Sequence, residues 1–147
     1  MIVSPQTSPA SEAGDAEPGP RAEPTAAQMV ARAEAMCPLL VERPAETERL
    51  TYYPEATHKE FSEAGFNRIL VPKRYGGCEF DLTTSWRVII ALARGCPSSA
   101  WCFGLAAGHA LMAGSLFEDD VQQELFGNGN FVCAAATAPS SPHGPVE

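Results

Sequence analysis

The chain has 147 residues and a formal net charge of -8, with 10 lysines and arginines against 18 acidic residues. This length suits a single folded domain. The acidic balance, without any basic run, excludes nucleic acid and anionic membranes as expected partners. The five cysteines have neither CxxC spacing nor histidines at zinc-finger intervals. We therefore predict reduced, mostly buried thiols, a cytoplasmic protein and no metal site.

Residues 1–24 are rich in Pro, Ser, Ala, Glu and Gly and offer little apolar surface to bury. They lack the basic start and continuous apolar segment of a secretory signal. Because burial cannot offset the entropy of ordering such a segment, we predict that it is disordered.

The first predicted helix covers residues 26–43, where apolar side chains recur at three- and four-residue steps. Thr25 precedes it and is a suitable N-cap. Pro38 falls inside the pattern and predicts a bend or a break. A second segment starts at Pro44, with acidic residues in its first turn, where they complement the helix dipole.

A third helix is predicted over residues 54–64, with Phe61 facing inward and Gly65 as its left-handed stop. Residues 66–82 then form a loop between helices, because Pro72 and a double glycine interrupt the apolar run. This loop is not a domain boundary.

A fourth helix covers residues 82–94, with Asp81 or Thr83 as its cap and Gly95 as its end. Its apolar stripe is predicted to face the core, and it consists of Trp86, Ile89, Ile90 and Ala93.

The stretch GCPSSAWCFGLAAGHALMAGSLF, residues 95–117, is apolar on every side except for His109. Ser98 or Ser99 can cap it. Its length approaches that of a membrane span, but glycines, a mid-depth histidine and the lack of cationic anchors beyond Arg94 argue against one. We predict a central buried helix instead.

Trp101 and His109 are eight positions apart, about 80° around the helix and about 12 Å along its axis. Leu105 and Met112 fall on the same side, while glycines leave room beside them. This arrangement suits an apolar pocket with one polar group that fixes a ligand's orientation. The alternative, a core histidine beside a tryptophan that only packs, is favoured by the pattern alone. Burial is also the better interpretation for the Cys102 thiol.

A short helix is predicted over residues 118–126, and residues 131–139 resemble a β-strand. The sequence ends within ten residues of that strand, which leaves it without a pairing partner. We therefore expect residues 25–130 to form a helical domain, and residues 131–147 to start a truncated second domain of a longer protein.

Three stretches, AGFNRILVPKRYGGCEFDL, ARGCPSSAWCFGLAAGHAL and FVCAAATAPSSPHG, resemble the N-terminal part of the acyl-CoA dehydrogenase superfamily. The P-x-x-Y-G-G motif is shared across that superfamily. The Cys-Pro-Ser-Ser-Ala-Trp segment followed by His109 points to its flavin-dependent aromatic monooxygenases, such as the oxygenase component of 4-hydroxyphenylacetate hydroxylase. The resemblance implies a mainly α N-terminal domain plus the first strand of a middle β-domain, in a subunit that forms a homotetramer.

The implied activity is that of a two-component flavin-dependent monooxygenase. Reduced flavin, FADH2 or FMNH2, comes from a separate NAD(P)H flavin reductase and reacts with dioxygen to a flavin hydroperoxide, which hydroxylates a phenolic or other small aromatic substrate.

The resemblance also implies roles for individual residues. His109 is the catalytic residue, which holds the phenolic oxygen and favours its deprotonated form. Trp101 forms a wall beside ring and flavin, and Leu105 and Met112 line the substrate site. The flavin-contacting loop contains Thr137, Pro139, Ser140 and Ser141.

Two alternatives remain. One is an acyl-CoA dehydrogenase-type FAD oxidoreductase, which is weakened because Ala138 replaces the glutamate of the dehydrogenases' Thr-Glu-Pro. The other is a truncated, non-catalytic remnant that is inactive alone and exposes apolar faces.

Overall fold

The computed structural model describes residues 23–127 and 131–132. Within these residues every regular element is helical, which confirms the predicted mainly α class. The predicted strand lies almost wholly outside the described residues, and so does the predicted disorder of residues 1–22. In chain order the elements are α1 (Ala26–Val41), α2 (Pro44–Leu50), α3 (Glu55–Glu63), η1 (Phe66–Arg68), η2 (Lys73–Tyr75), α4 (Leu82–Ala93), α5 (Pro97–Leu116) and α6 (Asp119–Phe126).

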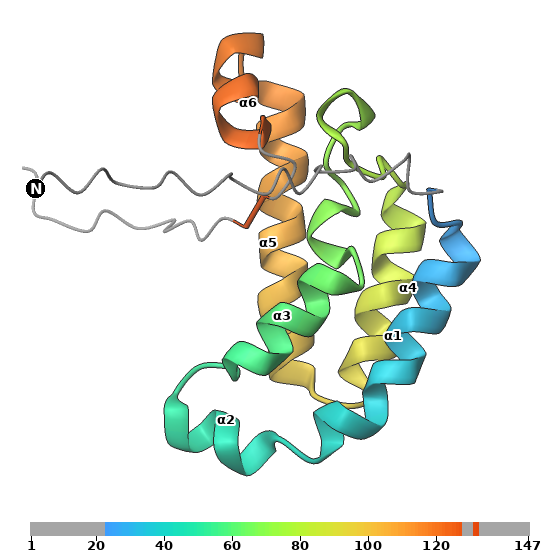
Figure 1. Cartoon of the computed structure of the whole chain (residues 1–147), viewed down its shortest axis with the longest axis vertical. Coiled ribbons are helices and arrows are strands. Elements are labelled where there is room, and N and C mark those ends of the chain that lie inside the picture. The colour runs from blue at the N-terminus through green and yellow to red at the C-terminus, as the bar shows by residue number, and fades with distance from the viewer. Residues whose placement is uncertain (1–22, 128–130, 133–147) are drawn as a thin grey trace, which may run out of the picture.

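The helices are arranged around α4 and α5. Figure 1 shows α1 on one side of α4 and the long α5 on the opposite side, with α3 in front of α5. α4 packs against both α1 and α5, and η1 bridges α3 and α5. α6 lies at the C-terminal end of α5 (Figure 1). None of the described helices is both long and apolar enough to cross a membrane.

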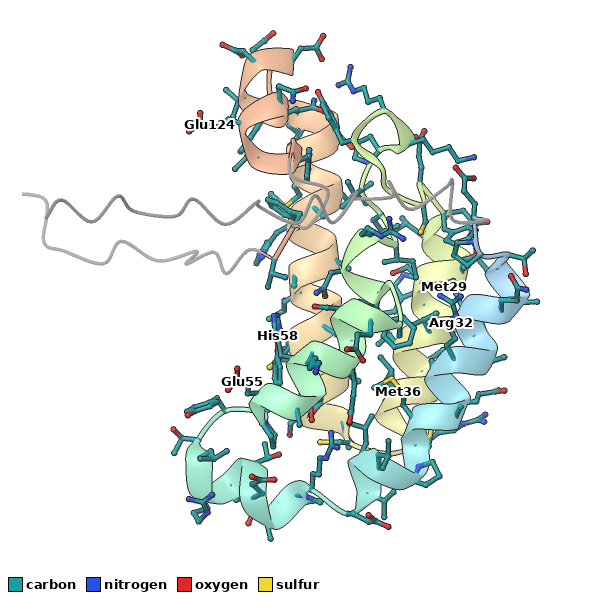
Figure 2. The ribbon with its side chains drawn as sticks, viewed as in Figure 1. Met29, Arg32, Met36, Glu55, His58 and Glu124 are labelled. Carbon is teal, nitrogen blue, oxygen red and sulfur yellow. The ribbon has the colours of Figure 1, made fainter. Side chains whose placement is uncertain are left out.

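The core confirms the apolar period predicted for the first helix. Met29 and Met36 extend from α1 toward the neighbouring helices, whereas Glu55 and Glu124 lie at the outer surface (Figure 2). At the centre, three buried phenylalanine rings meet with centroids 5.7 to 5.9 Å apart. Edge-to-face and tilted contacts at such distances stabilise the pairs beyond simple area burial. They come from α3, η1 and α5, and are Phe61, Phe66 and Phe103.

A capping box fixes the start of α1, and contacts with α4 hold its last turns. The Thr25 hydroxyl accepts from the Gln28 backbone N–H, while the Gln28 side chain accepts from the Thr25 N–H, which completes a capping box. Pro38 does not break the helix, which continues to Val41. The last turns are held against α4, because the Cys37 thiol donates to the Ala91 carbonyl oxygen over 3.0 Å and Leu40 is buried.

The predicted core stripe of α4 is right for Ile89 and Ala93, which are partly buried and pack against the core. It is wrong for Trp86 and Ile90, which are 59% and 57% exposed. The buried face instead contains Thr84, Ser85, Val88, Ala91 and Leu92. Both faces of this helix are apolar, and the face with the smaller side chains allows the close approach of α1 and α5.

Two predictions about the start of α5 also fail. Cys96 is the N-cap and Pro97 the first helical residue, so neither predicted serine caps the helix. Ser99 is buried and donates its hydroxyl to the Cys96 sulfur over 3.2 Å. The Cys102 thiol is exposed rather than buried, because it lies on the outer side of α5. Cys78 and Cys96 are buried as predicted.

The double glycine after η2 forms a tight turn. Gly76 has a φ of 75°, in the left-handed region that glycine adopts without steric cost. A Cβ at Gly77 would lie 1.9 Å from the Val71 carbonyl oxygen, so only glycine fits there. The returning chain is fixed by backbone bonds from Cys78 to Arg68 and from Phe80 to Ile69. The P-x-x-Y-G-G motif is therefore a structural turn that brings its loop onto α5.

An ion pair joins the end of α1 to α3. The Arg43 guanidinium donates to both Glu60 carboxylate oxygens, at 2.6 and 2.8 Å, and to the Thr57 hydroxyl at 2.9 Å. The hydrogen bonds from Arg43 hold the pKa of Glu60 below its ordinary value near 4.5, although burial opposes this shift. The side chains are only 20% and 29% exposed, so the pair is less screened by water than a surface pair.

Because the folded-state pKa of Glu60 is depressed, its contribution to stability is complete above its unfolded pKa and disappears as the pH falls through the folded value. We expect Glu60→Gln to lower the free energy of unfolding by about 1 to 2 kcal/mol at pH 7, and by much less near pH 3. Urea unfolding at both pH values measures this. Glu63→Gln is the control, since its pair with Lys59 is exposed. Equal losses for Glu60→Gln at both pH values contradict the prediction.

Candidate functional site

α5 has two apolar faces, and only one of them lies in the core. The inner face carries Ala100, Phe103, Ala107, Ala110 and Ala113. On the opposite side Trp101 is 68% exposed, Leu105 46% and Met112 56%. Large apolar side chains that recur along one exposed helix face indicate a surface that binds a ligand or another part of a protein. We call the set Trp101, Leu105, His109 and Met112 the outer face of α5.

The outer face contains all the predicted substrate-site residues. His109 follows Leu105 by one turn, and Met112 follows His109 on the same side. His109 is half-buried rather than fully enclosed. Its imidazole is the polar side chain of the outer face, whose other three residues are apolar.

A pocket of about 220 Å³ lies between α4 and α5. Of the predicted residues, Trp101 and Leu105 line it, whereas His109 and Met112 lie farther along the outer face. Its remaining lining residues are almost all apolar: Leu70, Leu82, Ser85, Trp86, Ile89, Ala100, Gly104 and Gly108. The structure therefore places a second tryptophan, Trp86, in the same pocket as Trp101. Trp86 was predicted from the sequence to face the core.

A signal for this pocket was present in residues 82–94, where apolar side chains occupy both sides of a predicted helix. One side, around Val88 and Leu92, is buried against the neighbouring helices. The other, with Leu82, Trp86 and Ile89, contributes to the pocket. A helix with apolar side chains on both sides has two surfaces to cover.

Tyr53 and His58 form a pair at the start of α3. The Tyr53 hydroxyl is 3.3 Å from His58 Nδ1, and the two rings stack with centroids 6.3 Å apart. Burial, and to a smaller extent the nearby Cys102 thiol, raises the pKa of Tyr53. Tyr53 also packs against Phe61, so this pair stabilises the entry to α3.

Arg74 connects η2 to α6. Its guanidinium donates to the Gln122 side chain at 2.7 Å and pairs with Asp119 at 2.8 Å. It also lies over the Tyr75 ring at 4.9 Å. Arg74 borders a separate pocket of about 390 Å³, with Glu79 and Ser115 among its lining residues. These contacts pair the charge of Arg74 with Asp119 and hold η2 against α6.

The predicted flavin-contacting residues Thr137, Pro139, Ser140 and Ser141 lie outside the described residues. Within the described part of the chain, no group of three or more His, Cys, Asp or Glu side chains is placed to hold a metal ion.

Comparison with known families then gives a direct match. Residues 23–124 match the family described as acyl-CoA dehydrogenase, N-terminal domain. The chain belongs to this family. The match covers α1 to α5 and most of α6, so this acyl-CoA dehydrogenase N-terminal domain contains the whole outer face of α5.

Curated relatives of this domain include a flavin-dependent monooxygenase, oxygenase subunit HsaA, of Rhodococcus jostii (strain RHA1). It is 32% identical over 97 residues, which are 66% of this chain and 25% of the relative. A pigment production hydroxylase of Rhodococcus sp. (strain ATCC 21145) is 28% identical over 123 residues, 84% of this chain and 31% of that protein. The chain thus spans a quarter to a third of the length of these relatives.

Two solved structures are similar to this domain, both with a TM-score of 0.67. XiaF from Streptomyces sp., in complex with FADH2 and glycerol, is 31% identical, and the match covers 71% of this chain and 26% of XiaF. The HsaA monooxygenase from M. tuberculosis is 26% identical, with 72% of this chain and 29% of that chain covered.

If the outer face of α5 is a site and not part of the core, its tryptophan contributes little to folding. We expect Trp101→Ala to change the free energy of unfolding by less than about 0.5 kcal/mol. Phe103→Ala, on the inner face of the same helix, is the matched comparison, and its loss is expected to reach about 3 to 5 kcal/mol. Urea unfolding monitored by circular dichroism measures both. Similar losses for the two variants would assign Trp101 to the core.

Proposed function

We propose that this domain contributes the substrate-facing wall of the oxygenase subunit of a two-component flavin-dependent monooxygenase. The reaction is the hydroxylation of a phenolic or other aromatic compound. The observation that carries this proposal is the outer face of α5, where one imidazole stands in a row of exposed apolar side chains. A flat, apolar ring with one polar substituent is the ligand that such a surface fits.

His109 is proposed as the catalytic residue of this wall. Its imidazole accepts or shares the proton of the phenolic oxygen, which raises the electron density of the ring and its reactivity toward an electrophilic oxygen. Trp101 and Leu105 precede it along α5 and Met112 follows it. These apolar side chains orient the ring and exclude water from it.

The residues present fit a flavin as the neighbouring group. The Trp101 side chain is 68% exposed, and an exposed indole plane provides a surface on which a planar ring system can lie. Reduced flavin, when bound, supplies the electrons that activate dioxygen. Thr137, Pro139, Ser140 and Ser141 are proposed to contact it, with Trp101 between flavin and substrate.

The relatives support a hydroxylase more than a dehydrogenase, because HsaA is named as a flavin-dependent monooxygenase and XiaF is in complex with FADH2. We further propose that a separate NAD(P)H flavin reductase delivers the reduced flavin. The proposed assembly is a homotetramer in which each subunit adds a middle β-domain and a C-terminal helical bundle to this domain. Its proposed location is the cytoplasm.

The test uses an oxygenase in which this domain is joined to the remaining domains of its kind. We expect His109→Ala to lower the rate of phenol hydroxylation at saturating reduced flavin by at least about 100-fold. Its dissociation constant for reduced flavin, measured anaerobically, is expected to change less than about threefold, because His109 is proposed to contact the substrate.

His58→Ala is the matched control, since His58 is also half-buried but pairs with Tyr53 on α3. It is expected to keep its hydroxylation rate. Equal losses of flavin binding and hydroxylation in His109→Ala, with a lower melting temperature, would make His109 a structural residue. Consumption of an acyl-CoA thioester by the unmodified protein would support the dehydrogenase alternative.

A further inference from the structure

The pocket between α4 and α5 carries a more specific inference. We propose that it is a subsite for a neutral aromatic group of two fused rings, held between Trp86 and Trp101. This inference deepens the proposed function and rests on it for the view that the bound molecule is a substrate. The binding itself is a property of this chain.

The size of the pocket exceeds what a single ring needs. A cavity of about 150 Å³ with aliphatic and aromatic walls holds one benzene molecule. The pocket between α4 and α5 measures about 220 Å³. It therefore has room for a second fused ring beside the first.

The lining of the pocket selects against charge. Ser85 contributes the one side-chain hydroxyl among the lining residues, and none of them carries a charge. An anionic or cationic group placed there loses its hydration without gaining an ion-pair partner. The two indole rings offer flat apolar surface and N–H donors, which suits a neutral aromatic ring with a hydroxyl or ring nitrogen.

The glycines of α5 shape the wall of the pocket. A Cβ at Gly104 would lie 3.2 Å from Ile89 Cδ1, so this glycine lets α4 and α5 approach closely. A Cβ at Gly108 would meet nothing within 4 Å, because Gly108 borders the open space of the pocket. A Cβ at Gly108 therefore causes no clash, and we expect a larger side chain there to extend into the pocket.

Leu105 connects the pocket with the proposed catalytic residue. It lines the pocket, and His109 follows it by one turn, which makes the two side chains neighbours on the surface of α5. A substrate that places its phenolic oxygen at His109 is thus positioned to extend its apolar part toward Trp86 and Trp101. This arrangement favours fused-ring substrates over single-ring phenols.

The test uses the indole N–H signals of the ¹⁵N-labelled 147-residue chain, which contains two tryptophans. Without flavin, we expect 2-naphthol to shift both signals and to bind at least about tenfold more tightly than phenol, because the second ring adds buried apolar area. The anion 2-naphthoate is expected to bind at least about tenfold more weakly than 2-naphthol. Similar dissociation constants for 2-naphthol and phenol, or signals that no aromatic compound moves, overturn the proposal.

Gly108→Leu is expected to weaken 2-naphthol binding at least about tenfold, while the better helix propensity of leucine preserves the fold. Ser98→Leu is the matched control, because Ser98 is on the same helix but outside the pocket, and this variant is expected to keep wild-type affinity.

Trp86→Ala is a second variant. Because the Trp86 side chain is exposed, its removal is expected to preserve the fold and to weaken 2-naphthol binding. Unchanged affinity in Gly108→Leu and Trp86→Ala overturns the subsite. Binding of 2-naphthol to a protein that fails to hydroxylate any phenol contradicts the proposed function alone.

Discussion

α5 is apolar around its whole circumference, and the rest of the structure depends on how its two faces are covered. The inner face, centred on Phe103 and a series of alanines, allows α4 and η1 to approach closely and closes the aromatic core. The outer face stays at the surface, because none of the described elements buries Trp101 or Met112. A helix with this composition requires a second layer or a ligand on its outer side.

The same requirement extends to α4. Its smaller side chains meet the bundle, while Trp86 and Ile90 remain exposed. α4 and α5 together form one continuous apolar surface with a pocket between them. His109 lies beside this surface on the outer face of α5, and we propose that its imidazole binds the polar edge of an aromatic ring. The relatives of this domain include flavin-dependent monooxygenases.

The sequence predicted helices where local signals are strong, and failed where tertiary packing decides. The Thr25 cap, the Pro44 start and the end of α3 follow from single residues whose backbone preferences are strict. The burial of Trp86 and Ile90 was mispredicted because the two faces of α4 are similarly apolar, so periodicity does not tell which one is buried. The exposure of Cys102 depends on the same choice of face in α5.

Of the candidate site, the row of residues on α5 was predictable from helical geometry, because spacing alone puts Trp101, Leu105 and Met112 on one side. The contribution of Trp86 was not, since it depends on how α4 packs against α5. The role proposed for His109 rests on a resemblance, because the pattern alone favoured a core histidine. Its half-buried position on an exposed face is the structural reason to prefer a site.

The most direct measurement of the central claim uses the methionine methyl groups. Met112 lies on the outer face and is 56% exposed, whereas Met29 and Met36 are buried at 0% and 8%. With ¹³C-methyl methionine in the 147-residue chain and a bound phenolic ligand, we expect intermolecular NOEs from the ligand ring to the Met112 methyl group. We expect none to the methyl groups of Met29 or Met36. Ligand NOEs to the Met29 or Met36 methyl groups, or saturable binding without any contact to Met112, would contradict the claim that the outer face of α5 is the substrate wall.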